Sequence, residues 1–196
     1  MTAQKDQEDI ANTLLGDMNA FSQLIDRHKN LVFTLSLQML KNKEEAEEAA
    51  QDTFLKVYKS LKKFKGGSKF STWLYRITYN TCLDRLKKNK RRQQTVAIDT
   101  VTIHKIQLLN TVLDTLEQQE RKEIIQHCLQ LLPASDSFLI TLYYFEELSL
   151  EEMAAIVRYT PNTIKVKLFR CRKRLMAILQ KKLEPELLES YESKNR

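Results

Sequence analysis

The chain has 196 residues, with 32 Lys and Arg against 25 Asp and Glu and a formal net charge of +7. Three glycines, three prolines and many helix formers favour an all-α protein with few turns. No apolar run approaches the roughly 18 residues that span a bilayer, and the polar, partly acidic N-terminus is unlike a signal peptide. The positive charge indicates a polyanionic partner, either nucleic acid or an acidic membrane surface.

The cysteines and histidines predict no metal centre. Cys82, Cys128 and Cys171 are far apart and form no CxxC pair, so we expect reduced thiols in a cytoplasmic protein. His28 falls on an apolar helical stripe with no second His or Cys at ligand spacing, which predicts a core histidine. We expect no metal, cofactor or small-molecule substrate.

Two helices are predicted in the first part of the chain. Residues 17–40 repeat apolar side chains at helical spacing. Residues 44–61 open with four glutamates, which suit the positive end of a helix dipole. The face of the second helix opposite its apolar stripe carries Gln51, Asp52, Lys56 and Lys59. This face is either a solvated surface or a docking surface for a large partner, and the residues alone do not decide.

A glycine loop and an aromatic, basic helix come next. Gly66 and Gly67 lie in the loop 64–69 and allow unusual backbone angles or a close approach to a ligand. The helix predicted over 71–90 carries Trp73, the chain's only tryptophan, among tyrosines, an asparagine and cations. Rings that stack on bases beside cations that pair with phosphates favour binding of single-stranded nucleic acid. The plainer alternative is a core tryptophan with solubilising cations.

Residues 93–119 are predicted to be a linker that becomes helical. Its start is polar and rich in Thr and Gln, and about 26 residues reach at most ~85 Å. This length exceeds two turns of duplex DNA at roughly 34 Å each. Two further helices are predicted over 120–132, which ends at Pro133, and over 135–145.

Residues 149–175 predict two short helices with a tight turn between them. Ser149 and Glu152 have the spacing of a capping box, and Thr160 followed by Pro161 starts a second helix. The second helix has an apolar stripe of Ile164, Leu168, Cys171 and Leu175. Residues 161–182 hold eight Lys or Arg and no Asp or Glu. The pattern is typical of a DNA-binding helix-turn-helix, and the alternative is a basic solvated helix in an ordinary bundle.

Two stretches together resemble a known family. Residues 44–92 contain QDTFLKVY and FSTWLYRITYNTCLDRLK, and residues 129–175 have the order leucine, proline, helix and helix-turn-helix. These stretches are similar to regions two and four of the sigma-70 family in its smallest form, the extracytoplasmic-function sigma factors. The resemblance implies two small helical domains, 1–92 and 120–183, joined by a flexible linker, 93–119, and followed by a polar tail, 184–196, which we expect to fray.

The resemblance implies a function and the residues that carry it. Region two would dock on bacterial core RNA polymerase, melt the promoter −10 element and hold a flipped base, and region four would read the −35 duplex. The polymerase contacts would be Gln51, Asp52, Thr53, Phe54 and Lys56. The −10 contacts would be Gly66, Gly67, Ser68, Lys69, Ser71, Thr72, Trp73, Arg76, Asn80, Asp84, Arg85 and Lys88. The −35 contacts would be Pro161, Asn162, Thr163, Lys165, Lys167, Arg170 and Lys173.

The resemblance also implies an anti-sigma factor as a partner, often membrane-anchored. One position departs from the family: Arg158 stands where the turn of the helix-turn-helix usually has glycine. A non-glycine residue in the left-handed conformation costs roughly 1 kcal/mol.

The main alternative function is a self-contained helix-turn-helix regulator with an N-terminal interaction domain. A nucleic-acid enzyme would need converging acidic or metal-binding residues, whereas the glutamates of 44–48 point around their helix.

Overall fold

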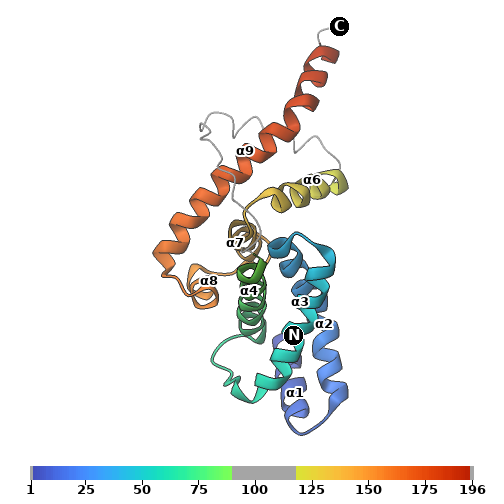
Figure 1. Cartoon of the computed structure of the whole chain (residues 1–196), viewed down its shortest axis with the longest axis vertical. Coiled ribbons are helices and arrows are strands. Elements are labelled where there is room, and N and C mark those ends of the chain that lie inside the picture. Colours follow the sequence, from blue (N-terminus) through green and yellow to red (C-terminus); the bar gives the residue numbers. More distant parts are fainter. Residues whose placement is uncertain (1, 90–117, 195–196) are drawn as a thin grey trace.

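The computed structural model describes residues 2–89 and 118–194 (Figure 1). All regular structure in these residues is helical, as the sequence predicted. The first part of the chain forms α1 (Thr2–Leu14), α2 (Met18–Leu40), α3 (Lys43–Ser60), the short 3-10 helix η1 (Leu61–Lys63) and α4 (Phe70–Asn89). The second part forms α6 (Gln118–Leu131), α7 (Ala134–Tyr144), α8 (Leu150–Val157) and α9 (Pro161–Lys194).

Local capping explains where the helices of the first part begin. The side chain of Asp17 accepts hydrogen bonds from the N–H groups of Asn19 and Ala20 at the start of α2. Asn42 accepts from the N–H of Glu45 at the start of α3, 2.8 Å away. Each cap satisfies N–H groups that have no partner inside the helix. The predicted boundaries of both helices are confirmed to within one residue.

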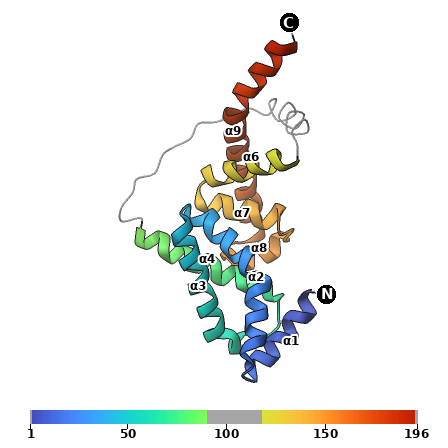
Figure 2. The same cartoon turned by 90° about the vertical axis from the view of Figure 1, so that its right-hand side faces the viewer.

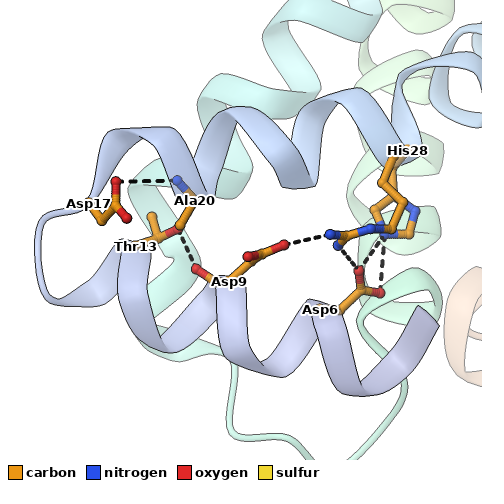
Figure 3. A network of polar contacts seen from close by, with 7 residues as sticks. Asp6, Asp9, Thr13, Asp17, Ala20 and His28 are labelled. Carbon is orange, nitrogen blue, oxygen red and sulfur yellow. Dashed lines mark hydrogen bonds and ion pairs between the residues drawn. The ribbon is translucent and has the colours of Figure 1, made fainter. Parts of the chain in front are cut away.

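Helix α1 was not predicted, because its buried side is not apolar. Asp6, Ile10 and Thr13 are the buried positions, at the spacing i, i+4 and i+7. Only Ile10 of these would count toward a hydrophobic stripe, so the usual periodicity does not show. The helix packs along α2 (Figure 3). It also contacts η1 and α4.

The end of the chain also differs from the prediction. We expected a fraying tail from residue 184, but α9 continues as one helix from Pro161 to Lys194, through Pro185. A proline inside a helix costs about 3 kcal/mol. The flanking leucines, glutamates and lysines are good helix formers, which favours continuation on either side. The predicted linker falls mainly on residues 90–117, which lie outside the described residues.

The two helical units pack against each other. Figure 2 shows α1–α4 below and α6–α9 above, with α7 and α8 between α9 and the first unit. Helix α7 lies on α2, and α8 lies on α4. One buried cluster crosses this contact, joining Leu35, Met39, Tyr75 and Tyr79 of the first unit to Phe138 and its neighbours in the second. A separate cluster around Leu24, Phe70 and Trp73 is the first unit's own core.

Candidate nucleic-acid interface

A cavity of about 290 Å³ opens beside the glycine loop at the start of α4. Its walls combine rings, small residues and cations: Lys63, Phe64, Lys65, Gly67, Ser68, Thr72, Trp73, Arg76 and Ala155. The ring centroids of Phe64 and Trp73 are 5.3 Å apart. Gly66 has φ of 72°, a left-handed conformation that the loop obtains at little cost only with glycine. The predicted loop and tryptophan are therefore brought together around one hollow.

Two residues of the cavity wall are largely buried. Trp73 is 9% exposed, so it is both a core residue and a lining residue, and the two alternatives considered for it are not exclusive. Thr72 is 6% exposed, and its Oγ1 is the one buried side-chain oxygen or nitrogen without a hydrogen-bond partner in the described part of the chain. An unpaired buried hydroxyl costs about 1–3 kcal/mol, and such groups are rare in folded proteins.

Tyr75 and Tyr79 do not line this cavity. The sequence had suggested that the aromatic rings of this helix stack on bases. Both tyrosines are buried under the second unit, where the Tyr75 hydroxyl donates a hydrogen bond to Oε2 of Glu146. Burial, and then the bond to Glu146, raise the pKa of Tyr75 above its ordinary range. The ring of Tyr79 lies 4.8 Å from that of Phe138. In this arrangement neither ring is free to stack on a base.

Helix α8 of the second unit lies over the cavity. Ala155 is part of the wall, and Oε1 of Glu152 lies 3.5 Å from Nζ of Lys69 in the loop. The backbone N–H of Ser149, and then Lys69, hold the pKa of Glu152 below its ordinary value. The cavity and the helix-turn-helix are therefore neighbours in this conformation.

A second, more polar groove of about 470 Å³ is lined by residues of both α3 and α4. Arg85 donates to Glu48, at 2.9 Å, and to Asp52, and Lys56 donates to Thr81 at 3.1 Å. The hydrogen bond to Asp52, and then that to Glu48, raise the pKa of Arg85. Asp84 and Lys88 line the same groove. The structure thus places the predicted −10 residues Asp84, Arg85 and Lys88 beside the predicted polymerase residues Asp52 and Lys56, away from Trp73.

The exposed face of α3 differs in part from the predicted polymerase contacts. Thr53 and Phe54 are buried, and Thr53 donates to the carbonyl of Ala49, so these two residues support the helix from inside. Gln51 and Lys56 are exposed as expected. Leu55 and Tyr58 are 58% and 46% exposed on the same helix and were not among the expected contacts. Their spacing from Gln51, i+4 and i+7, was the available signal.

The helix-turn-helix has the predicted caps. The capping box of Ser149 and Glu152 is complete, and the Thr160 hydroxyl accepts from the N–H of Thr163 at 3.2 Å. Arg158 has φ of 59° and ψ of 42°, the left-handed conformation expected for the turn. Its N–H donates to the carbonyl of Ala154.

The second helix of the motif, the start of α9, divides into a buried and an exposed face as predicted. Ile164, Leu168 and Cys171 are buried. The exposed face carries Asn162, Lys165, Arg170 and Lys173, and it also presents Val166 and Phe169. Lys167 lies over the ring of Tyr159, at 4.7 Å, and Lys173 over that of Phe169, at 5.1 Å. Both lysines therefore make cation–π contacts, and neither forms an ion pair with a carboxylate among the described residues.

Within 2–89 and 118–194, no helix is long and apolar enough to cross a membrane. In the same residues, no group of three or more His, Cys, Asp or Glu side chains could hold a metal ion. His28 instead bonds Asp6.

Comparison with known proteins agrees with this architecture. Residues 24–92 match the family described as Sigma-70 region 2, and residues 122–175 match Sigma-70, region 4. The chain is 33% identical to the ECF RNA polymerase sigma factor SigW of Bacillus subtilis, covering 82% of this chain and 89% of that protein. It is 29% identical to the RNA polymerase sigma-H factor of Pseudomonas aeruginosa, covering 97% and 100%.

Two solved structures have the same fold. One is the sigma factor RpoE in complex with the anti-sigma factor NepR from Bartonella quintana, with a TM-score of 0.61, 26% identity and coverage of 82% of this chain and 96% of that one. The other is CnrH in complex with the cytosolic domain of CnrY, with a TM-score of 0.58, 21% identity and coverage of 90% and 97%.

These matches cover both helical units and define the class of protein. The chain belongs to the extracytoplasmic-function group of the sigma-70 family of RNA polymerase sigma factors. It is therefore a transcription initiation factor whose partners are core RNA polymerase and promoter DNA. A self-contained helix-turn-helix regulator, the main alternative, is not favoured.

Proposed function

We propose that the unit spanning 1–92 binds core RNA polymerase and opens the −10 element, and that the unit spanning 120–183 reads the −35 element. The observation that carries the proposal is the pairing of a ring-lined cavity in one unit with a basic helix-turn-helix in the other. Opening a promoter needs a pocket for an unstacked base, and reading a duplex needs a helix that fits the major groove.

The −10 site is the cavity between the glycine loop and α4. A base would enter beside Phe64 and Trp73, and its neighbouring phosphates would pair with Lys63, Lys65 and Arg76. The Thr72 hydroxyl, which lacks a partner within the described residues, could form its missing hydrogen bond to that base after a small side-chain movement. Base stacking on aromatic rings is worth about 1–3 kcal/mol per base.

The polymerase-docking surface is the exposed face of α3, with Gln51, Asp52 and Lys56 as its polar residues and Leu55 and Tyr58 as its apolar ones. Arg85 holds the Asp52 and Glu48 carboxylates from α4 and so fixes the geometry of this surface. Asp84 and Lys88 belong to the same groove. We therefore assign these three α4 residues to the docking side of the unit.

The −35 site is the exposed face at the start of α9. Asn162, Thr163 and Lys165 stand at the N-terminal end, which enters the major groove in helix-turn-helix proteins. Lys167, Arg170 and Lys173 follow at positions suited to flanking phosphates.

The proposed function requires the two units to separate on DNA. Ala155 and Glu152 of α8 lie at the cavity wall and on Lys69, so the −10 site is partly covered in this conformation. The −10 and −35 elements also lie turns of duplex apart, whereas here α8 rests on α4. The predicted linker is long enough to span that separation.

We further propose that the protein acts in the cytoplasm, without covalent chemistry of its own, and that an anti-sigma factor controls it. Both solved relatives named above are complexes, one with an anti-sigma factor and one with the cytosolic domain of CnrY. Support for the location comes from the reduced-thiol expectation and from the partner, core RNA polymerase.

The test is transcription by core RNA polymerase from Bacillus subtilis, with and without this protein, on a library of random promoters. Promoter-specific initiation that is lost on Trp73→Ala or Arg76→Ala, with polymerase binding retained, supports the assignment. Since Trp73 is also a core residue, the exposed Arg76 provides the cleaner variant. If the protein binds duplex DNA tightly alone as a dimer and never associates with core enzyme, the assignment is wrong.

A further inference from the structure

Helix α1 carries a polar network that leads from the N-terminus of the chain to the ring-lined cavity. This helix precedes the stretch that matches Sigma-70 region 2, which begins at residue 24. One residue of this helix, Asp6, is only 4% exposed, although it carries a carboxyl group. A buried carboxylate is tolerated only when it is paired and hydrogen-bonded. The partners of Asp6 therefore show which residues hold α1 in place.

Asp6 is paired with two consecutive residues of α2 (Figure 3). Both of its carboxylate oxygens lie 3.1 Å from Nε2 of His28. A carboxylate only accepts, so Nε2 carries the hydrogen, and the ring is fixed in orientation. Arg27 donates to Asp6 with one nitrogen and to Asp9 with the other. The pKa of Arg27 is raised, mainly by its hydrogen bond to Asp9, so the guanidinium stays charged.

The fixed histidine ring then packs against the cavity's aromatic wall. The ring of His28 meets Phe70 edge-on, with centroids 5.4 Å apart and planes at 60°. Phe70 in turn lies 5.9 Å from Trp73 and 5.8 Å from Phe64, both of which line the cavity. His28 and Phe70 are each 5% exposed. Closely packed interiors transmit displacement from one ring to the next.

We propose that Asp6 and His28 are positioning residues for the −10 site: α1, through this pair, braces Phe70 and thereby sets the spacing of Phe64 and Trp73 around the entering base. Neither residue touches DNA. The inference rests on the proposed function for its consequence, promoter opening, but the bracing of Trp73 exists in the free protein and is measurable there.

The first experiment uses the intrinsic fluorescence of the free protein, since Trp73 is the only tryptophan in the chain. Asp6→Ala removes the acceptor of His28, while Asp9→Asn is a matched control that alters the same arginine but not the histidine. We expect a red-shifted emission and easier acrylamide quenching in Asp6→Ala, near-native behaviour in Asp9→Asn, and rescue in Asp6→Asn, which still accepts a hydrogen bond. Equal spectra for all four proteins would overturn the proposal.

The second experiment places 2-aminopurine in the −10 element of a promoter selected from the library and follows its unstacking by the holoenzyme. Since misplacement of a positioned group by about 1 Å costs up to 10²-fold, we expect Asp6→Ala to slow unstacking on the order of tenfold. Affinity for core polymerase and for the −35 duplex should stay as in Asp9→Asn. Phe70→Leu, which keeps α1 and removes the relay ring, should reproduce the defect if Asp6→Ala proves too unstable.

The two proposals fail in different ways. If the wild-type holoenzyme never unstacks the probe, the proposed −10 function is wrong, whereas the fluorescence result still decides the brace. If wild type unstacks the probe and Asp6→Ala slows it only as much as Asp9→Asn does, α1 is merely a stabilising helix and the positioning role is wrong.

Discussion

The Nζ of Lys69 lies 3.5 Å from Oε1 of Glu152, so a cation beside the Trp73 cavity is paired with a carboxylate at the start of the helix-turn-helix. Lys69 is one of the residues that the sequence predicted to contact −10 DNA. The carboxylate and a DNA phosphate would compete for the same ammonium group. We propose that this ion pair must break before Lys69 contacts DNA.

Glu152→Gln should increase the affinity of the free protein for single-stranded DNA. Glutamine keeps the capping box at this position but removes the charge. Lys69 is exposed, and exposed ion pairs are worth about 0.2–1 kcal/mol, so the gain should be at most about fivefold. Fluorescence anisotropy with a labelled single-stranded −10 oligonucleotide measures it. Glu151→Gln, an exposed neighbour, is the control, and equal gains in both variants would contradict the competition.

The hydrogen bond from Tyr75 to Glu146 should contribute to the packing of the two units. A bond to a charged group is worth about 1.5–3 kcal/mol, so a double-mutant cycle of Tyr75→Phe and Glu146→Ala, which removes the acceptor, should give a coupling energy in that range. Urea unfolding of the four proteins measures it. The cycle of Tyr79→Phe with Glu146→Ala should give under about 0.5 kcal/mol. A Tyr75 cycle as small as the Tyr79 cycle would refute the claim.

Arg158→Gly should stabilise the helix-turn-helix. The residue has φ of 59°, where a side chain costs roughly 1–2 kcal/mol and glycine does not. The extra entropy of unfolded glycine offsets about 0.4–1 kcal/mol, which leaves a gain of about 0.5–1 kcal/mol. Urea unfolding is again the measurement. Arg158→Ala keeps a Cβ and should give no gain, so a similar gain in both variants would point away from backbone strain.

Lys173→Ala should reduce the salt dependence of promoter binding. Each phosphate neutralised by a cation contributes about −0.9 to the slope of log K against log salt for duplex DNA. Holoenzyme binding to a promoter duplex at several KCl concentrations should show a slope smaller by about that amount. Lys29→Ala, on α2 and paired with Asp26, should leave the slope unchanged. An unchanged slope for Lys173→Ala would remove this residue from the −35 site.

The buried thiols should make the protein less stable at alkaline pH. Burial raises the pKa of Cys82 to about 11 and that of Cys171 to about 12, above an ordinary value of 9.0. Between pH 9 and 11 the unfolded chain loses these protons while the folded chain keeps them, so the free energy of unfolding falls as pH rises. Cys82→Ala should show a shallower fall over this window than wild type, measured by urea unfolding. Equal slopes would contradict the assignment to this thiol.

The sequence by itself determined the features that depend on neighbouring residues. The caps at Ser149 and Thr160, the left-handed Arg158 and the apolar stripe of α9 all follow from spacings within one or two turns. Such patterns are local, because a cap needs only the next three residues and a stripe only the helical repeat. The family resemblance came from the same stretches, and the comparisons confirmed it.

Only the tertiary structure decided what each face of a helix meets. Tyr75 and Tyr79 are buried because the second unit packs on α4, and Arg85 pairs with α3 rather than facing the cavity. Helix α1 was not predicted from the sequence because its buried side includes the polar residue Asp6. The partner of Asp6, His28, lies 22 positions away in the chain. Burial of a polar group depends on a distant partner that satisfies it, and no local pattern records that partner.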